Sequence, residues 1–335
     1  MVPTIRPKSL GPAITLAADI GCALVVLCST PEQARQALEE CRPSADGVLV
    51  TYVPADHLNL LAFLTSEHPE NEVEPSCHVD IARKRNVGLL LGRLCGWRTV
   101  MFLDDDIRDM TARALTQAAA MTTRFQAVGF TIGCYPDNSV VCHAHRLGGG
   151  TQDVFPGGSA LLVDVTRSDT LFPPIYNEDW LFLFDATQRR SFAVAGALSQ
   201  LEYQPFARSR RAASEEFGDV IAEGLFRLLH EGGSVPDATP DYWRSTLDRR
   251  SRLIDDIAGR LLLNERYEPV TGYALMSLAA ARKRLADVTE LSCLSFVRAW
   301  RTDVGIWREN LTNLPVLGDL ADAAKYLDLP ILTGA

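Results

Sequence analysis

Short apolar runs alternate with helix-type patterns through the first hundred residues, and this alternation limits the fold more than any other feature. The runs CALVVLCS (22–29), GVLVTYVP (47–54) and RTVMFL (98–103) contain no charged residue apart from Arg98. Strands that helices cover on both faces have continuous apolar sequences of this kind, because neither face meets water. The pattern therefore predicts an α/β fold built on an open sheet.

The helices between these strands carry start and stop signals. Thr30 fits an N-cap, Pro31 fits the first helical position, and Gln33 completes a capping box. The next helix is expected to begin near Asp80 and to end on Gly96, because glycine readily takes the left-handed conformation that terminates helices.

Further strands are predicted at 126–135, 139–147, 159–165 and 191–198. The first two are expected to pair through a turn at Pro136-Asp137-Asn138. His143 and His145 would then share one face of the second strand, where histidines bind a metal or serve a structural role.

From about residue 212 the chain is predicted to be almost wholly helical. Phe296, Trp300, Val304 and Trp307 form an apolar stripe at helical spacing and are expected to pack in the core. We therefore divide the chain into an α/β domain, residues 1–205, and a helical region, residues 206–335.

Three aspartates, Asp104, Asp105 and Asp106, stand side by side after the run 98–103. Like charges repel, and a divalent cation relieves the repulsion because it prefers hard oxygen ligands. The first and third positions of a strand point to the same side, so Asp104 and Asp106 can converge on one Mg²⁺ or Mn²⁺ ion. The carboxyl end of a strand is also where open α/β sheets bind ligands. The plainer alternative is a solvated acidic turn at the start of a helix.

Composition narrows the classes of partner. The formal net charge of −9 argues against nucleic-acid binding, and an anionic ligand would need a local basic patch or a metal. The run Arg208-Ser209-Arg210-Arg211 could clamp a diphosphate or a phosphorylated acceptor, or could lie in solvent. No run is apolar enough for a transmembrane segment, and the scattered cysteines fit reduced core residues, so a cytoplasmic protein is expected.

The order of these parts resembles the GT-A nucleotide-sugar glycosyltransferases, especially their family-two-type members. The resemblance spans roughly residues 20–200 and rests on Lys84-Arg85-Asn86, FLDDDI, FPGGSALLVDV and NEDWLF in this order. It implies a GT-A type fold, a Rossmann-like mixed sheet flanked by helices, followed here by the helical region. It also implies a nucleoside diphosphate sugar as donor and a hydroxyl group as acceptor, whose identity the sequence does not give.

The resemblance assigns roles to particular residues. Asp104 and Asp106 would bind the metal and the diphosphate. The expected donor-binding residues are Arg85, Asn86, Arg93, Asp104, Asp105, Gly157 and Gly158, with the two glycines also shaping the acceptor side. In inverting members a carboxylate of an E-D pair is the general base, which points to Asp179, with Glu178 second.

Two features depart from the family. The run 22–29, interpreted as the opening strand, ends in Cys28-Ser29-Thr30 and lacks the usual proline-threonine ending. Many members place a histidine after the E-D pair as third metal ligand, but no histidine lies between His145 and His230. The contact to the nucleotide base and the third metal ligand are therefore unassigned.

Other hypotheses stay open. Residues 105–109 also spell DDxxD, the magnesium pattern of isoprenyl diphosphate synthases, with a partial copy at Asp255-Asp256. That family is all-helical, whereas the runs above predict strands. A phosphatase or a nucleotidyltransferase would use similar strand-end carboxylates, and a catalytically inactive GT-A-like scaffold is the non-enzyme alternative. The helical region is expected to cover the acceptor side or to form a homodimer contact.

Overall fold

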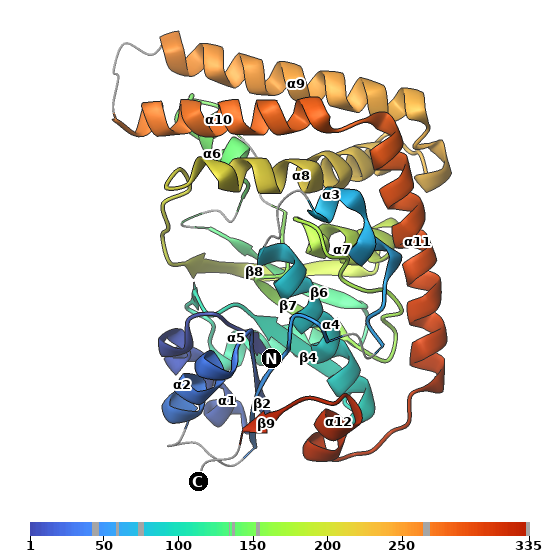
Figure 1. Cartoon of the computed structure of the whole chain (residues 1–335). Coiled ribbons are helices and arrows are strands. Elements are labelled where there is room, and N and C mark those ends of the chain that lie inside the picture. Colours follow the sequence, from blue (N-terminus) through green and yellow to red (C-terminus); the bar gives the residue numbers. More distant parts are fainter. Residues whose placement is uncertain are drawn as a thin grey trace.

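The computed structural model describes residues 1–41, 47–57, 60–72, 77–133, 135, 138–151, 155–263 and 269–332. Two mixed sheets form its centre, with helices on their faces (Figure 1). The first sheet has the order β1 (Val2–Pro3), β2 (Leu24–Cys28), β3 (Val48–Tyr52) and β9 (Ile331–Leu332). Strands β1, β2 and β3 are parallel, and β9 is antiparallel to β3.

The second sheet is mainly antiparallel. Its order is β4 (Thr99–Leu103), β7 (Ala160–Asp164), β6 (Ala127–Ile132), β8 (Phe192–Gln200) and β5 (Ile107–Arg108). Only β6 and β8 are parallel neighbours. The prediction of a mixed α/β fold is confirmed.

Met1 joins the two sheets. Its nitrogen donates to the carbonyl of Met101 at 2.7 Å, and its carbonyl accepts from the nitrogen of Leu103 at 3.1 Å. This is the pattern of a parallel pair, so β1 runs beside β4 in the same direction. The carboxyl ends of β1 and β4 therefore meet, and the residues that follow each strand come together.

Helices from the first half of the chain, together with one near its end, pack against the two sheets and against one another. They are α1 (Gly11–Ile20), α2 (Pro31–Cys41), α4 (Cys77–Leu94), α5 (Ala112–Met121) and α12 (Leu320–Tyr326), with short helices η1 (Pro7–Ser9), η3 (Leu64–Glu67) and α3 (Pro69–Glu72). Thr30 caps α2 as predicted, although the side chain of Gln33 accepts from Ser29 instead of Thr30. The chain leaves α4 through Gly96, whose φ is +69°.

The strand predicted at 139–147 is wrong, because Val140–Leu147 forms the helix α6. Ser139 caps it by accepting from the nitrogen of Cys142. A helix directs His143 and His145 apart: His143 contacts the hydroxyl of Tyr203, and His145 contacts Arg260. They form no shared site. Most of the turn predicted at 136–138 lies outside the described residues.

The predicted helical region is largely confirmed. It contains α8 (Ser209–His230), η4 (Val235–Asp237), α9 (Pro240–Leu263), α10 (Pro269–Asp287) and α11 (Glu290–Asn313), after α7 (Glu178–Gln188). In Figure 1, α8, α9 and α10 form a layer beyond β8, and α11 runs down one side toward α12. The apolar stripe of α11 is fully buried, as expected.

The end of the chain returns to the first sheet. The nitrogen of Leu317 donates to the carbonyl of Leu94 at 2.7 Å, and β9 then pairs with the edge of β3. The region 206–335 is therefore not wholly helical, since its last segment completes the sheet of the α/β half. The apolar pair Ile331 and Leu332 was too short a run to predict this strand.

Candidate functional site

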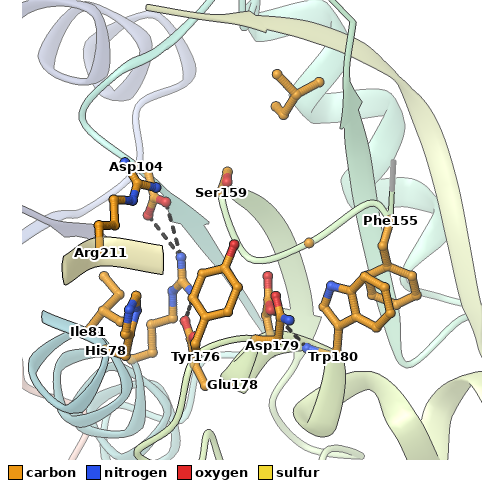
Figure 2. A pocket seen from close by; sticks show the side chains of 14 residues that line it. His78, Ile81, Asp104, Phe155, Ser159, Tyr176, Glu178, Asp179, Trp180 and Arg211 are labelled. Atoms are coloured by element: carbon orange, nitrogen blue, oxygen red, sulfur yellow. Dashed lines mark hydrogen bonds and ion pairs between the residues drawn. The ribbon is translucent and has the colours of Figure 1, made fainter. Parts of the chain in front are cut away.

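Two adjoining cavities lie at the joined carboxyl ends of β1 and β4. One, of about 190 Å³, is lined by Glu178, Asp179 and Trp180, and we term it the Asp179 cavity (Figure 2). The other, of about 360 Å³, is lined by Arg6 and by all three aspartates of the predicted motif, and we term it the Arg6 cavity. Asp104, Ile81 and Arg211 line both. Two molecules bound in these cavities would meet at these residues.

The three aspartates follow β4 in a turn and not in a strand. The nitrogen of Ile107 donates to the carbonyl of Asp104 at 3.2 Å, which closes the turn. The alternation of a strand therefore does not apply to Asp104, Asp105 and Asp106. Arg6 donates through Nη2 to both Asp105 and Asp106, whereas Asp104 accepts from Arg85 at 3.0 Å.

Guanidinium groups thus supply the positive charge for which the sequence suggested a metal. Asp105 also accepts from the hydroxyl of Thr4, and Asp106 from the amide of Gln200 at 3.2 Å. Within the described ranges, no group of three or more His, Cys, Asp and Glu side chains is arranged to hold a metal ion. In this arrangement the aspartates do not fit a metal site, and Mg²⁺ or Mn²⁺ at Asp104 and Asp106 stays an untested prediction.

Arg85 is buried at the wall of the Asp179 cavity and links two of its carboxylates. Its Nη2 donates to Asp104 and its Nη1 to Glu178. Burial opposes a charge on Arg85, but Asp104 and Glu178 outweigh this and raise its pKa. Burial also raises the pKa of Glu178 to about 8, although Arg85 counteracts the rise. Both predicted residues therefore belong to the site, with Glu178 on its buried side.

Asp179 faces the cavity from the first turn of α7. Its carboxylate accepts from the nitrogen of Gly158 and, at 2.9 Å, from the nitrogen of Trp180. The turn before it is set by Asn177, which has a φ of 61° and donates to Asp219 of α8 at 3.0 Å. Two backbone N–H groups thus fix the carboxylate while leaving it at the cavity wall.

The predicted pair Gly157 and Gly158 holds these charged groups in place. A Cβ on Gly157 would overlap Oδ2 of Asp179, and a Cβ on Gly158 would overlap the guanidinium of Arg85. The absence of a side chain at each position is therefore what allows both groups to approach the loop.

Two predicted donor-binding residues lie away from both cavities. Asn86 is buried, and its side-chain amide both donates to and accepts from the backbone of Phe172 at 2.8 Å. Arg93, about two turns further along α4, donates to the carbonyl of Ser168 at 2.9 Å. Their polar groups serve the packing of α4 against the loop before α7, so neither prediction is supported.

Several residues of the site were not predicted. Arg6 lies shortly after β1, which ends at Pro3 and is followed by Thr4, the proline-threonine pair that the run 22–29 lacks. That pair was a usable signal, but the strand itself is too short to be found from its pattern. The rings of His78 and Tyr176 pack edge to face beside the Asp179 cavity, with their centroids 4.8 Å apart. Burial, and then Arg211, lower the pKa of His78 to about 3.

Of the basic run 208–211, which the structure describes in full, only Arg211 lines the two cavities. Its Nε donates to Glu215 at 2.6 Å. Its guanidinium lies over the ring of Tyr203, with Cζ 4.5 Å from the ring centroid. Figure 2 shows Arg211 and Asp104 on one side of the Asp179 cavity and Trp180 with Phe155 on the other. The helical region therefore contributes to the site through α8.

A search against protein-family models found no match for this chain, and a search of curated proteins also found none. Within the described part of the chain, no helix is both long enough and apolar enough to cross a membrane. The case for a function therefore rests on the chemistry of the two cavities.

Proposed function

We propose that this protein is a glycosyltransferase that moves a sugar from a nucleoside diphosphate sugar to a hydroxyl acceptor. The observation that carries the proposal is the fixed carboxylate of Asp179 at the wall of one cavity, beside a second cavity that contains Arg6, Lys84 and Arg211. The first suits a hydroxyl that must lose a proton, and the second suits an anionic diphosphate.

The reaction assigned to this arrangement is a displacement at the anomeric carbon. The acceptor oxygen forms a bond to this carbon, and its proton passes to Asp179. The bond between the carbon and the diphosphate oxygen breaks, and its electron pair leaves with the nucleoside diphosphate. Asp179 as a directly placed base predicts inversion, and Glu178 stays the second candidate for this role.

The proposal includes a GT-A type fold, and the arrangement of the strands supports this part of it. Strands β3, β2, β1 and β4 run parallel, the antiparallel part of the second sheet follows, and the cavities lie at the carboxyl ends of β1 and β4. Ligands bind at this edge in open α/β sheets. No step above depends on a metal. The cytoplasmic location and a homodimer stay predictions.

The isoprenyl diphosphate synthase hypothesis is weaker. The mixed sheets do not match an all-helical protein. Asp255 and Asp256 are largely exposed on α9 and pair with Arg282 and Arg260. The structure does not argue against the hypothesis of an inactive GT-A-like scaffold. The experiment below distinguishes this hypothesis from the enzyme proposal.

The test measures release of nucleoside diphosphate from UDP-, GDP-, dTDP- and CDP-sugars, with mixed hydroxyl acceptors, by wild type and Asp179→Asn. We expect turnover of one donor class and its loss in Asp179→Asn, while binding of the nucleoside diphosphate persists. Asp241→Asn, an exposed change on α9, is the matched control. Binding without turnover in wild type would favour the scaffold, and binding of no nucleoside diphosphate would overturn the proposal.

A further inference from the structure

Three cationic side chains from separate segments converge on the Arg6 cavity of an acidic protein. They are Arg6 after β1, Lys84 on α4 and Arg211 on α8. A local basic patch is what an anionic ligand requires in a chain of net charge −9. The question is which of the three has donors left for a ligand.

Two of them line only this cavity and are paired with carboxylates. Lys84 is buried and bonds to Asp80, to the hydroxyl of Ser29 and to the carbonyl of Thr4. An ammonium has three donors, so these contacts account for all of them. Arg6 donates through Nη2 alone to both Asp105 and Asp106, so it keeps other donors, but two carboxylates already balance its charge.

Arg211 differs because it lines both cavities and pairs with a single carboxylate, that of Glu215. Within the part of the chain that the structure describes, its hydrogen bond goes from Nε to Glu215, and neither Nη has an acceptor. The stacking on Tyr203 fixes the plane of the guanidinium, and the side chain is only partly exposed. The two Nη groups form a preoriented fork at the junction of the two cavities, the geometry that binds a phosphate through two bonds.

We infer that Arg211 binds the diphosphate of the donor, so that the helical region takes part directly in donor binding. This inference rests on the proposed function. Arg211 lines both cavities, so a diphosphate bound in the Arg6 cavity would keep its leaving oxygen near Arg211 while the acceptor lies by Asp179. The neighbouring Arg208 and Arg210 are exposed and line neither cavity, and they have no part in this role.

Isothermal titration calorimetry on the full chain tests this, with UDP, GDP, dTDP, CDP and inorganic diphosphate, each in EDTA and in Mg²⁺. We expect Arg211→Met to weaken the diphosphate ligand about tenfold or more and Arg211→Lys to weaken it less, because lysine keeps the charge and loses the fork. The nucleoside without phosphates should bind all variants equally. Arg210→Met is the matched control and should bind like wild type.

The outcomes separate this inference from the proposed function. If wild type binds only inorganic diphosphate and Arg211→Met does not, Arg211 is an anion site and the glycosyltransferase proposal fails. If a nucleoside diphosphate binds wild type and Arg211→Met equally, the inference is overturned while the proposed function stands. Circular dichroism checks folding, and Arg211→Lys decides in the same way if Arg211→Met does not fold.

Discussion

Asp104 and Glu178 share one buried guanidinium, that of Arg85. Asp104 follows β4 and Glu178 begins α7, so a side chain of α4 ties together the elements that carry the two cavities. A buried charge network of this kind is costly to break, because removing one partner leaves the others buried and uncompensated. The geometry of the site and the stability of the fold therefore depend on the same residue.

Replacing Arg85 should destabilise the whole protein. We expect Arg85→Met to lower the free energy of unfolding by about 3 to 5 kcal/mol, as for other broken buried ion pairs. Urea denaturation followed by circular dichroism measures this. Arg35→Met, which removes an exposed pair with Glu32, should change the free energy of unfolding far less. Equal effects of the two variants would contradict the structural role of Arg85.

The two loop glycines should have separable effects. Gly157→Ala displaces Asp179, so we expect turnover to fall about 10- to 100-fold, as a small misplacement of a reacting group can cause, with donor binding retained. Gly158→Ala displaces Arg85 and should lower stability by about 1 to 3 kcal/mol.

Gly259→Ala provides the control for both variants. This glycine lies within α9 with open space at its Cβ position, so alanine should raise stability by about 0.5 to 1 kcal/mol. Unchanged turnover in Gly157→Ala would show that the position of Asp179 does not matter for the reaction.

The sequence predicted the longer strands because their burial on both faces leaves a continuous apolar run. It failed at α6, since the pair Val140-Val141 suits a strand or a buried helix turn equally well. One contact at the start of this helix is made by Glu215 of α8, which accepts from the nitrogen of Val140 at 2.7 Å. A partner so distant in the chain leaves no local signal.

The candidate site was predictable where a motif marks it and hidden where the fold assembles it. Asp104, Glu178 and Asp179 stand in recognisable motifs, and all line the Asp179 cavity. Arg6 reaches Asp105 and Asp106 only because Met1 pairs beside β4, a relationship between segments about a hundred residues apart. The donor-binding prediction for Asn86 stays unsupported, since the side-chain amide of this residue bonds to the backbone of Phe172.

Protonation of the buried histidines should lower stability in acid, whereas the raised pKa of Glu178 acts in the opposite direction. The pKa of His78 is lowered to about 3 by burial, whereas in the unfolded chain it is about 6.5. Between these values only the unfolded state binds the proton, so stability falls as pH falls from 6.5 toward 3. The expected loss is roughly 2 kcal/mol between pH 6.5 and pH 5 for this group alone.

His78→Phe tests the assignment, because phenylalanine keeps a ring against Tyr176 and binds no proton. Urea denaturation should show that the free energy of unfolding of this variant, relative to that of wild type, is higher at pH 5 than at pH 6.5. His143→Phe should act in the same direction, since burial lowers the pKa of His143 to about 4. The same pH dependence in His78→Phe and wild type would refute the assignment.

Arg6 should compete with divalent cations for Asp106. A metal ion that binds this carboxylate must displace a guanidinium that already neutralises both Asp105 and Asp106. We therefore expect Mn²⁺ to bind the free wild-type protein weakly and Arg6→Met several-fold more tightly, because the variant leaves two adjacent carboxylates uncompensated. Calorimetric titration with Mn²⁺ measures this, with Arg35→Met as control.

Adding Asp106→Asn to Arg6→Met should abolish the gain, since the cation then loses one of its two carboxylates. Tight binding by wild type that Arg6→Met leaves unchanged would mean that the cation binds elsewhere, and the sequence-based assignment of Asp106 as a metal ligand would be wrong.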